Sequence, residues 1–205
     1  HRDNHFFYLP SDAAGGGPPL RLPGEDGSLG QRHFDPESEV GKVTGNNAIT
    51  WTPSAHDWYE TVKLNYGHHF SADRDTSHLP GPRAPIEDVP RTWQTMDEIL
   101  AYWQEMGVDG FRCDMAHMIP IEFWRWVVGR CRERSQEVYF FAEAYDNVPA
   151  KLSHAHVLDE LLRAGFDAVY DDPIYDVLEG IYDAGKWAND LDSLTFTGAR
   201  FHKSL

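Results

Sequence analysis

Three charged residues in two short apolar segments have the types and the spacing for chemistry. In GVDGFRCDMAHM, residues 107–118, one residue separates Arg112 from Asp114. A β-strand directs alternate side chains to one face, so these two charges would share a face. The segment FFAEAY, residues 140–145, carries Glu143, which lies 29 residues after Asp114 (143 − 114 = 29). Two carboxyl groups across a cleft can cleave a glycosidic bond, one as nucleophile and one as proton donor.

The surroundings of the two carboxyl groups predict different protonation states. Arg112 would keep Asp114 ionised, because an opposite charge nearby lowers the pKa of a carboxyl group. Glu143 follows the apolar run 139–142, and partial desolvation there favours the protonated acid. A purely structural interpretation stays open, since an Asp at a strand end often caps a helix and an Arg nearby is often its ion-pair partner.

The order of helices and strands after residue 90 predicts how these residues are positioned. Hydrophobic periodicity and β-rich runs predict helices over 92–106, 119–135, 149–165 and 173–185, and strands over 108–114, 138–145 and 166–171. Successive strand starts are 30 and 28 residues apart (138 − 108 and 166 − 138), the rhythm of βα units around a parallel sheet. Both an open doubly wound sheet and a (β/α)8 barrel fit. In a barrel the strand ends form one rim, where Asp114 and Glu143 would lie close together.

The first 60 residues have a different texture. Gly and Pro interrupt them throughout, as in GGGPP at 15–19, so we expect loops and short strands, followed by a brief strand over 61–66. We therefore divide the chain into an irregular insertion, residues 1–60, and a partial barrel, residues 61–205. A complete barrel needs about 250 residues, so the chain would hold only the middle of one.

Composition excludes several classes of partner. The net charge of −15 argues against nucleic acid, because no basic stripe is available to neutralise phosphates, and it leaves neutral substrates open. No apolar run approaches the ~20 residues of a membrane span. Two cysteines give no disulfide framework, and Cys113 is expected to be a small buried residue. The chain starts at His1 without a signal-like segment and its ends resemble cuts through a longer protein, so its compartment and oligomeric state are left open.

Two motifs carry a resemblance to a known family. GVDGFRCDMAH and FFAEAY resemble the central motifs of the alpha-amylase family, glycoside hydrolase family 13, in which the first lies on the fourth barrel strand and the second on the fifth. VKLNYG, residues 62–67, is similar to the short Leu-Asn motif that precedes the fourth strand. The resemblance implies an incomplete TIM (β/α)8 barrel of about strands 4 to 6 with their helices. Residues 1–60 then resemble the insertion after the third strand that is called domain B.

The resemblance also implies roles for individual residues. Asp114 would be the nucleophile of a retaining glycoside hydrolase acting on α-linked glucans such as starch or maltooligosaccharides. Glu143 would be the acid and base, and Arg112 would hold Asp114 in place. His117 occupies a position that in the family often contacts the sugar, although a His at a helix start is equally expected as a cap or surface residue.

Other functions remain open at this point. An α-glucan transglycosylase or isomerase of the same family, a non-catalytic amylase-like carbohydrate-binding domain, and an unrelated βα-barrel enzyme such as a metal-dependent lyase are the alternatives. The family's Asp-x-x-x-x-His motif and its later His-Asp motif, which holds the third catalytic carboxylate, are absent from these 205 residues. We therefore expect the 205 residues alone to be inactive or nearly so.

No cofactor is required for the chemistry. The resemblance allows a structural Ca2+, since many family members bind one between the barrel and domain B. Asn46, Asn47 and Asp57 are the candidate oxygen donors here, although polar loop residues of this kind usually form turns.

Overall fold

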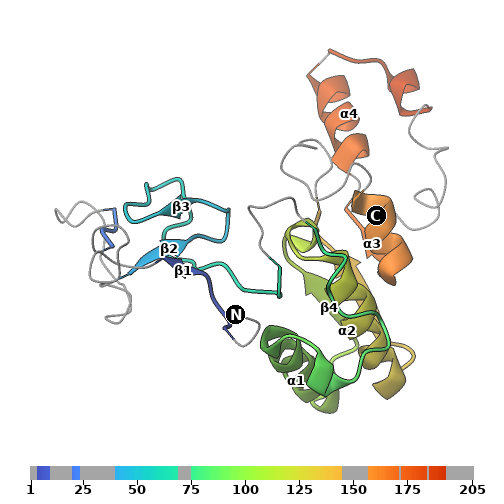
Figure 1. Ribbon diagram of the computed structural model, residues 1–205. Helices are drawn as coiled ribbons and strands as arrows, with labels where there is room; N and C mark the ends of the chain where they lie inside the picture. The colour runs from blue at the N-terminus through green and yellow to red at the C-terminus, as the bar shows by residue number, and fades with distance from the viewer. Residues whose placement is uncertain are drawn as a thin grey trace. The chain divides into compact units, whose positions relative to one another are not determined.

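The computed structural model describes residues 4–9, 20–23, 40–68, 75–144, 157–170, 172–183 and 185–192. The chain forms two compact units (Figure 1), one of residues 1–73 with 90–92 and one of residues 74–89 with 93–205. The helices and the parallel strands belong to the second unit, apart from the first two residues of its first helix. The part of the predicted helix at 149–165 that precedes residue 157 lies outside the described residues.

The first unit contains a small antiparallel sheet. Its strands β1 (Tyr8–Leu9), β2 (Gly41–Val43) and β3 (Ile49–Thr50) lie in the order β1-β2-β3. The strand predicted over 61–66 is reduced to one isolated bridge between Leu64 and Phe6. Short strands separated by loops are therefore what the described part of this unit contains, as the frequency of Gly and Pro predicts.

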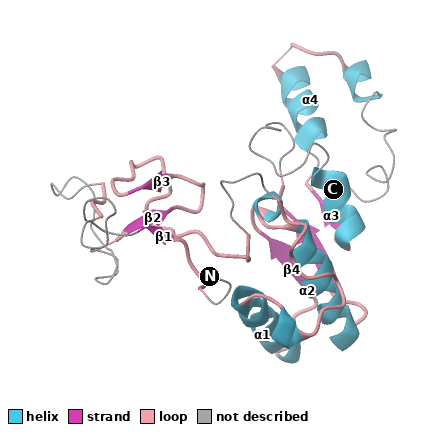
Figure 2. Cartoon of the chain, in the orientation of Figure 1, coloured by secondary structure: helices cyan, strands magenta, loops and turns pink. Residues whose placement is uncertain are grey.

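The second unit alternates helices with parallel strands (Figure 2). In chain order the main elements are α1 (Arg91–Glu105), β4 (Gly110–Cys113), α2 (Ile121–Arg134), β5 (Tyr139–Ala142), α3 (Val157–Ala164), β6 (Ala168–Val169) and α4 (Asp172–Tyr182). The 3-10 segments are η3 (Ile86–Asp88), η4 (Ala116–Met118) and η6 (Ala188–Leu191). Strands pair in the order β4-β5-β6, all parallel, so the predicted sequence of βα units is confirmed.

Two helices end at the glycines that the sequence places there. Gly107 has a φ of 89° and follows α1, and Gly165 has a φ of 118° and follows α3. After α1, the Val108 amide donates to the Trp103 carbonyl and the Gly107 amide to the Gln104 carbonyl. These two bonds form a Schellman motif, which requires a left-handed residue and therefore favours glycine. This motif turns the chain from α1 into β4.

Aromatic side chains fill the core between the sheet and its helices. Phe140 on β5 and Phe166 before β6 are fully buried, and their rings meet edge to face with centroids 6.0 Å apart. Trp124 on α2 packs edge to face on Phe166 at 5.0 Å. Such pairs contribute about 0.5–1.5 kcal/mol each beyond the burial of their area. This packing fixes one face of the sheet against α2 and leaves the other face for the carboxyl groups.

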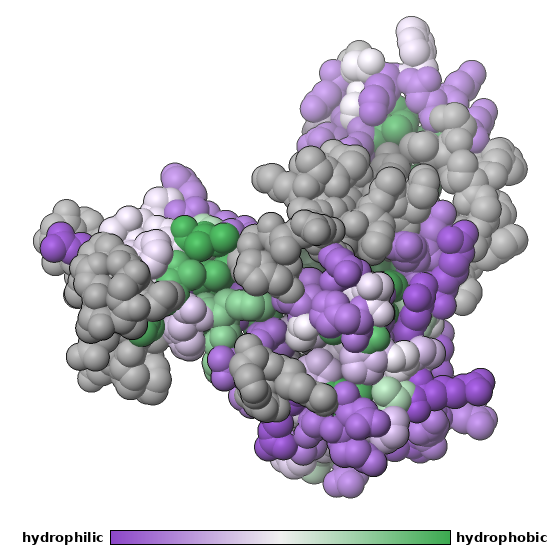
Figure 3. All heavy atoms as spheres, in the orientation of Figure 1, coloured by the Kyte–Doolittle hydropathy of each residue, from purple (hydrophilic) through white to green (hydrophobic). Residues whose placement is uncertain are grey.

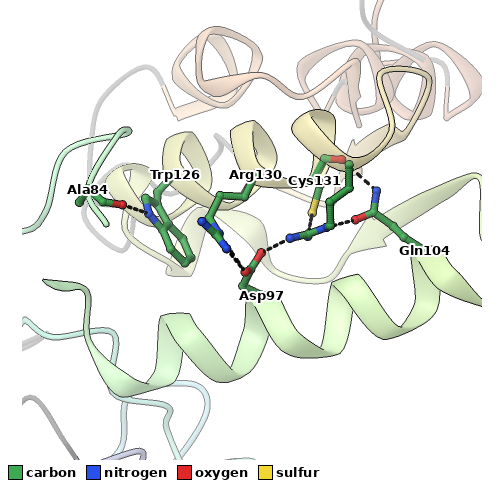
Figure 4. A network of polar contacts seen from close by, with 7 residues as sticks. Ala84, Asp97, Gln104, Trp126, Arg130 and Cys131 are labelled. Carbon is green, nitrogen blue, oxygen red and sulfur yellow. Dashed lines mark hydrogen bonds and ion pairs between the residues drawn. The ribbon is translucent and has the colours of Figure 1, made fainter. Parts of the chain in front are cut away.

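A polar network joins α1 to α2 (Figure 4). The buried Asp97 carboxylate accepts bonds from Arg130 at 2.8 Å and from Arg134 at 2.7 Å. Gln104 accepts a bond from Arg134 and donates to the carbonyl of Cys131. Arg134 lies in the last turn of α2, where the helix macrodipole also favours a cation. The network therefore sets how α1 lies along α2.

The apolar stripe of α1 is only partly buried. Trp93 is fully buried and packs on Trp126 with ring centroids 5.6 Å apart, whereas Ile99 and Trp103 farther along the helix and Met106 directly after it are exposed. On the face seen in Figure 3, hydrophilic residues cover much of the described surface around α1 and α2. None of the helices in the described part of the chain combines the length and hydropathy that a bilayer span requires.

Candidate active site

The register of the parallel strands brings the predicted site residues together. Arg112 on β4 pairs with Phe141 on β5, and Phe141 pairs with Ala168 on β6. Two residues farther along each strand stand Asp114, Glu143 and Tyr170. The backbone continues the pairing there, since the Glu143 amide donates to the Cys113 carbonyl at 2.9 Å. Because directly opposed residues of a sheet share a face, these side chains gather at one edge of the three strands.

One guanidinium group joins the two carboxyl groups. Nη1 of Arg112 lies 2.8 Å from Oδ1 of Asp114, and Nη2 lies 2.9 Å from Oε1 of Glu143. The ion pair with Asp114 is the one that the sequence predicts. The ion pair with Glu143 was missed. The 29-residue offset shared by the Arg112–Phe141 pair and the Asp114–Glu143 pair places the two carboxyl groups opposite each other, but it does not indicate that Arg112 reaches Glu143 (141 − 112 = 143 − 114 = 29).

The two carboxyl groups have different surroundings. The side chain of Asp114 is 72% exposed, whereas that of Glu143 is 14% exposed. The pKa of Asp114 lies below its ordinary value because of hydrogen bonding with the Glu143 side chain and then with Arg112. The same contacts act in reverse on Arg112, whose pKa is raised by its hydrogen bonds to Asp114 and then to Tyr170. Asp114 is therefore held as an accessible anion, and Glu143 sits in a more enclosed position.

The loop after Asp114 is tied to Glu143. Met115 adopts the left-handed conformation with a φ of 46° and a ψ of 41°, which is uncommon for a residue other than glycine. Its amide donates to Oε2 of Glu143 at 3.2 Å, and the Ala116 amide donates to the Glu143 carbonyl at 2.8 Å. Nε1 of Trp124 donates to the Ala116 carbonyl at 2.9 Å. Helix α2 thus anchors the loop after Asp114, and this loop orients the Glu143 side chain.

His117 lies in η4, next to the same backbone. Its side chain is buried, and burial lowers its pKa, while a hydrogen bond with the Glu143 backbone and the charge of Glu143 act in the opposite direction. The ring therefore stays neutral at pH 7. His117 is placed close to the acid that the sequence singles out, but its contact with a sugar remains a prediction.

Tyr170 completes the edge, and no motif in the sequence pointed to it. Its amide donates to the Ala142 carbonyl at 3.1 Å, so it follows β6 in the same register as Glu143 on β5. Its ring meets that of Phe141 edge to face at 4.6 Å, and the Arg112 guanidinium carbon lies 6.0 Å from its centroid. Only an alignment of the third strand with the first two could have pointed to it.

Cys113 lies on β4 between the two charged residues and faces the other way. Its side chain is half-buried, and burial raises the pKa of its thiol to about 12. The cysteine is therefore a neutral packing residue rather than a nucleophile.

The candidate Ca2+ donors lie in turns of the first unit. Oδ1 of Asn46 accepts a bond from the Thr44 hydroxyl at 2.6 Å, Asn47 occupies a left-handed turn position, and Oδ2 of Asp57 accepts from the Ser54 amide at 2.8 Å. Among the described residues, no group of three or more His, Cys, Asp or Glu side chains could hold a metal ion. The described donors thus form turns rather than a ready oxygen cage, and the Ca2+ site stays a prediction.

Comparison with known proteins gives local sequence matches and broader fold matches. No family model matches the chain. The alpha-1,4-glucan:maltose-1-phosphate maltosyltransferase of Cereibacter sphaeroides is 35% identical over 82 residues, which are 40% of this chain and 13% of that protein. The enzyme of the same name from Rhodospirillum rubrum is 24% identical over 130 residues, 58% of this chain and 17% of that protein.

Two solved structures share the fold. An alpha-amylase from Lactobacillus plantarum superimposes with a TM-score of 0.55 at 21% identity, covering 74% of this chain and 33% of that one. The resemblance to the alpha-amylase family is thereby confirmed. A cyclic alpha-maltosyl-(1→6)-maltose hydrolase from Arthrobacter globiformis gives a TM-score of 0.50 at 20% identity, with 73% of this chain and 29% of that one covered.

The amylase-like chain spans only a small part of each relative, from about an eighth of the maltosyltransferases to a third of the amylase. Its parallel strands β4 to β6 and their helices match part of the barrel fold of these solved structures, so the predicted incomplete (β/α)8 barrel is confirmed. The activity and substrates of the whole protein are taken up below as proposals.

Proposed function

We propose that the protein to which this chain belongs cleaves α-linked glucans with retention of configuration. Asp114 would be the nucleophile and Glu143 the acid and base. The observation that carries the proposal is the pair of carboxyl groups at the ends of neighbouring parallel strands, joined through the two terminal nitrogens of Arg112. In a βα-barrel, this is the edge at which active sites form.

The shared contacts of the pair support the retaining mechanism. Retaining enzymes place their carboxyl groups about 5–5.5 Å apart, whereas inverting enzymes leave about 6.5–9.5 Å for a water molecule. Asp114 and Glu143 share one guanidinium group and interact with each other, which supports the shorter separation. The exposure of Asp114 supports its role as nucleophile, because an anomeric carbon must reach it.

The proposed reaction has two steps, and Asp114 and Glu143 account for the bonds and protons in both. A carboxylate oxygen of Asp114 attacks the anomeric carbon while the glycosidic C–O bond breaks, and Glu143 gives its proton to the leaving oxygen. In the second step Glu143 takes a proton from water or from a sugar hydroxyl, whose oxygen attacks the same carbon and releases Asp114. Arg112 would keep Asp114 anionic before the attack and after its release, and would hold the carboxyl group in position.

The first experiment follows the anomeric configuration of the product. The protein as it is naturally expressed is mixed with maltoheptaose, and proton NMR records the first product anomer. We expect the α-anomer, and we expect Asp114→Asn to lower turnover by at least about 10³-fold while maltooligosaccharides still bind. Initial release of the β-anomer would refute retention, and unchanged activity of Asp114→Asn would refute the nucleophile assignment. Sugar binding without turnover in the unmodified protein would favour the carbohydrate-binding alternative.

Transfer to a sugar is a second candidate for the same chemistry. It is favoured by the sequence matches, because the relatives that are 30–35% identical over local segments are named maltosyltransferases. The two candidates differ only in the acceptor of the second step, which is water in one and a glucan hydroxyl in the other. Nothing in the residues Arg112, Asp114 and Glu143 distinguishes between these acceptors.

An acceptor assay separates the candidates. The protein is incubated with maltose 1-phosphate and a short glucan, and both phosphate release and glucan length are followed. A transferase lengthens the glucan and releases one phosphate for each maltosyl unit transferred. A hydrolase does not lengthen the short glucan in this assay. When it is given maltoheptaose instead, it shortens that substrate with a matching rise in reducing ends.

A further inference from the structure

Tyr170 is held in a fixed position at the same edge as the two carboxyl groups. Its amide is tied to the Ala142 carbonyl at 3.1 Å, and its ring stands edge to face against Phe141 with centroids 4.6 Å apart. Phe141 itself pairs with Arg112 in the sheet register. The phenol ring is therefore set by backbone and by packing, although it stays exposed on one side.

Arg112, by contrast, needs help to hold two carboxyl groups. Its side chain is 46% exposed, and a long, solvated side chain with several rotatable bonds populates many rotamers. The guanidinium carbon lies 6.0 Å from the centroid of the Tyr170 ring, within the range of a cation–π contact. A flat ring beside a flat guanidinium group limits the directions in which its nitrogens can point.

We infer that Tyr170 is a positioning residue that holds the Arg112 guanidinium in the orientation that serves Asp114 and Glu143 together. The role of Tyr170 in catalysis rests on the proposed function, whereas the effect of Tyr170 on the pKa of Asp114 does not. The raised pKa of Arg112, to which Tyr170 contributes through a hydrogen bond, agrees with a close contact. A packing residue on Phe141 alone would have no effect on Asp114.

The titratable groups near the Asp114 carboxylate come from each element around it. They are Arg112 on β4, Glu143 after β5, Tyr170 after β6 and His117 in η4. Helix α3, which packs on η4, carries Asp159 and Glu160 in its first turn. Of these, Glu143 and Arg112 act directly on the pKa of Asp114. Tyr170 would act through Arg112, and this route can be tested.

The test measures the protonation of Asp114 without any sugar. The naturally expressed protein and its variants are labelled at pH 5.5 with a water-soluble carbodiimide and an amine, which modify protonated carboxyl groups. Mass spectrometry of the peptide that contains Asp114 gives the labelling rate, and the carboxyl group is exposed enough to react. At a pH above the pKa, this rate is proportional to the protonated fraction, so a rise of one pKa unit is a tenfold rise in rate.

We expect Tyr170→Leu to raise the labelling rate of Asp114 by roughly threefold, because a less constrained Arg112 stabilises the anion less. Tyr182→Leu is the matched control, since Tyr182 is an exposed tyrosine on α4, and its rate should be unchanged. A Tyr170→Leu rate equal to that of the control would overturn the inference. If the Leu variant does not fold, Tyr170→Met is measured in the same way.

A double-mutant cycle tests the route through Arg112. Arg112→Gln alone should raise the labelling rate, and adding Tyr170→Leu to it should change nothing further. A threefold rise that persists in the Arg112→Gln background would mean that Tyr170 merely shields Asp114, and would overturn the inference.

Kinetics on maltooligosaccharides add a readout that separates positioning from sugar binding. Tyr170→Leu should lower kcat with little change in KM, whereas a raised KM with unchanged kcat would mark a sugar contact and contradict positioning. The labelling result stands even if no glucan is turned over, so failure of the proposed function and failure of this inference are distinguishable.

Discussion

Replacing Asp97 by Asn should loosen the contact between α1 and α2. The substitution keeps the shape of the side chain and removes its charge. Two arginines, Arg130 and Arg134, then face each other one helical turn apart without the carboxylate that now accepts from both. Like charges at this spacing on a helix repel. Asn also has an NH2 donor where Asp97 has its second oxygen, so one of the two arginines loses its acceptor and faces a donor instead.

The expected loss is about 2–4 kcal/mol in the free energy of unfolding. Breaking a buried ion pair by removing one partner costs about 3–5 kcal/mol. The Asp97 side chain is 5% exposed and qualifies as buried, but both arginine side chains are 29% exposed. Because the arginines can regain water when the carboxylate is lost, the cost falls somewhat below the full value.

Hydrogen exchange of the α2 amides measures this loss locally. Under conditions where exchange reports the opening equilibrium, a loss of 2–4 kcal/mol corresponds to exchange that is roughly 30- to 700-fold faster. Glu98→Gln provides the control, because Glu98 is the exposed neighbour on α1 and a surface change should stay within about 0.5 kcal/mol. An Asp97→Asn effect no larger than that of the control would refute the role given to the network.

Two further predictions concern packing and protonation. Gly110→Ala should cost about 1–3 kcal/mol of unfolding free energy, because the added Cβ would lie 2.6 Å from the Tyr139 carbonyl oxygen, whereas Gly129→Ala on the open face of α2 should gain about 0.5–1 kcal/mol. Equal effects in urea titrations would contradict this reading. Burial raises the pKa values of Cys113 and Cys131 to about 12 and about 11, so both stay protonated at pH 8 and should react with iodoacetamide only after unfolding. Since unfolded thiols ionise near 9.0, the unfolding free energy should also fall as pH rises from about 9 toward 11, and rapid labelling of the native protein at pH 8 would show the thiols to be accessible.

Local sequence patterns predict the elements of the second unit well. The helical stripe of 92–106, the glycines at 107 and 165 and the spacing of the strand starts each depend on neighbours within a few residues. The described helices and strands begin and end within a few residues of the predicted bounds where both are visible. Most of these boundaries differ by one to three residues, and the strands end earlier than predicted because a strand ends where its partner ends.

The placement of Asp114 and Glu143 was also predictable, because register and strand spacing coincide. The pairing of Arg112 with Phe141 carries the same 29-residue offset as the two carboxyl groups. The ion pair between Arg112 and Glu143 and the contact between Arg112 and Tyr170 depend instead on the side-chain rotamers at the edge of the sheet. No local pattern encodes that choice.

Long-range pairing and burial were the features that the sequence could not supply. The β-rich run at 61–66 predicts a strand, but the structure has an isolated bridge between Phe6 and Leu64 there. These two residues lie far apart in the chain, so a local pattern cannot predict how they pair. Ile99 and Met106 have the period of a buried stripe but are exposed. Periodicity predicts which side of a helix is apolar, and the neighbouring elements decide how much of that side is covered.

Trapping of a covalent intermediate tests the central claim, that Asp114 is a nucleophile assisted by Glu143. The Glu143→Gln variant of the naturally expressed protein is incubated with an activated, fluorinated α-maltosyl donor, digested and analysed by mass spectrometry. We predict that the peptide containing Asp114 gains the mass of one glycosyl unit, and that fragmentation places it on the Asp114 carboxyl group. An adduct on another residue, or donor consumption without any adduct, would contradict the assignment.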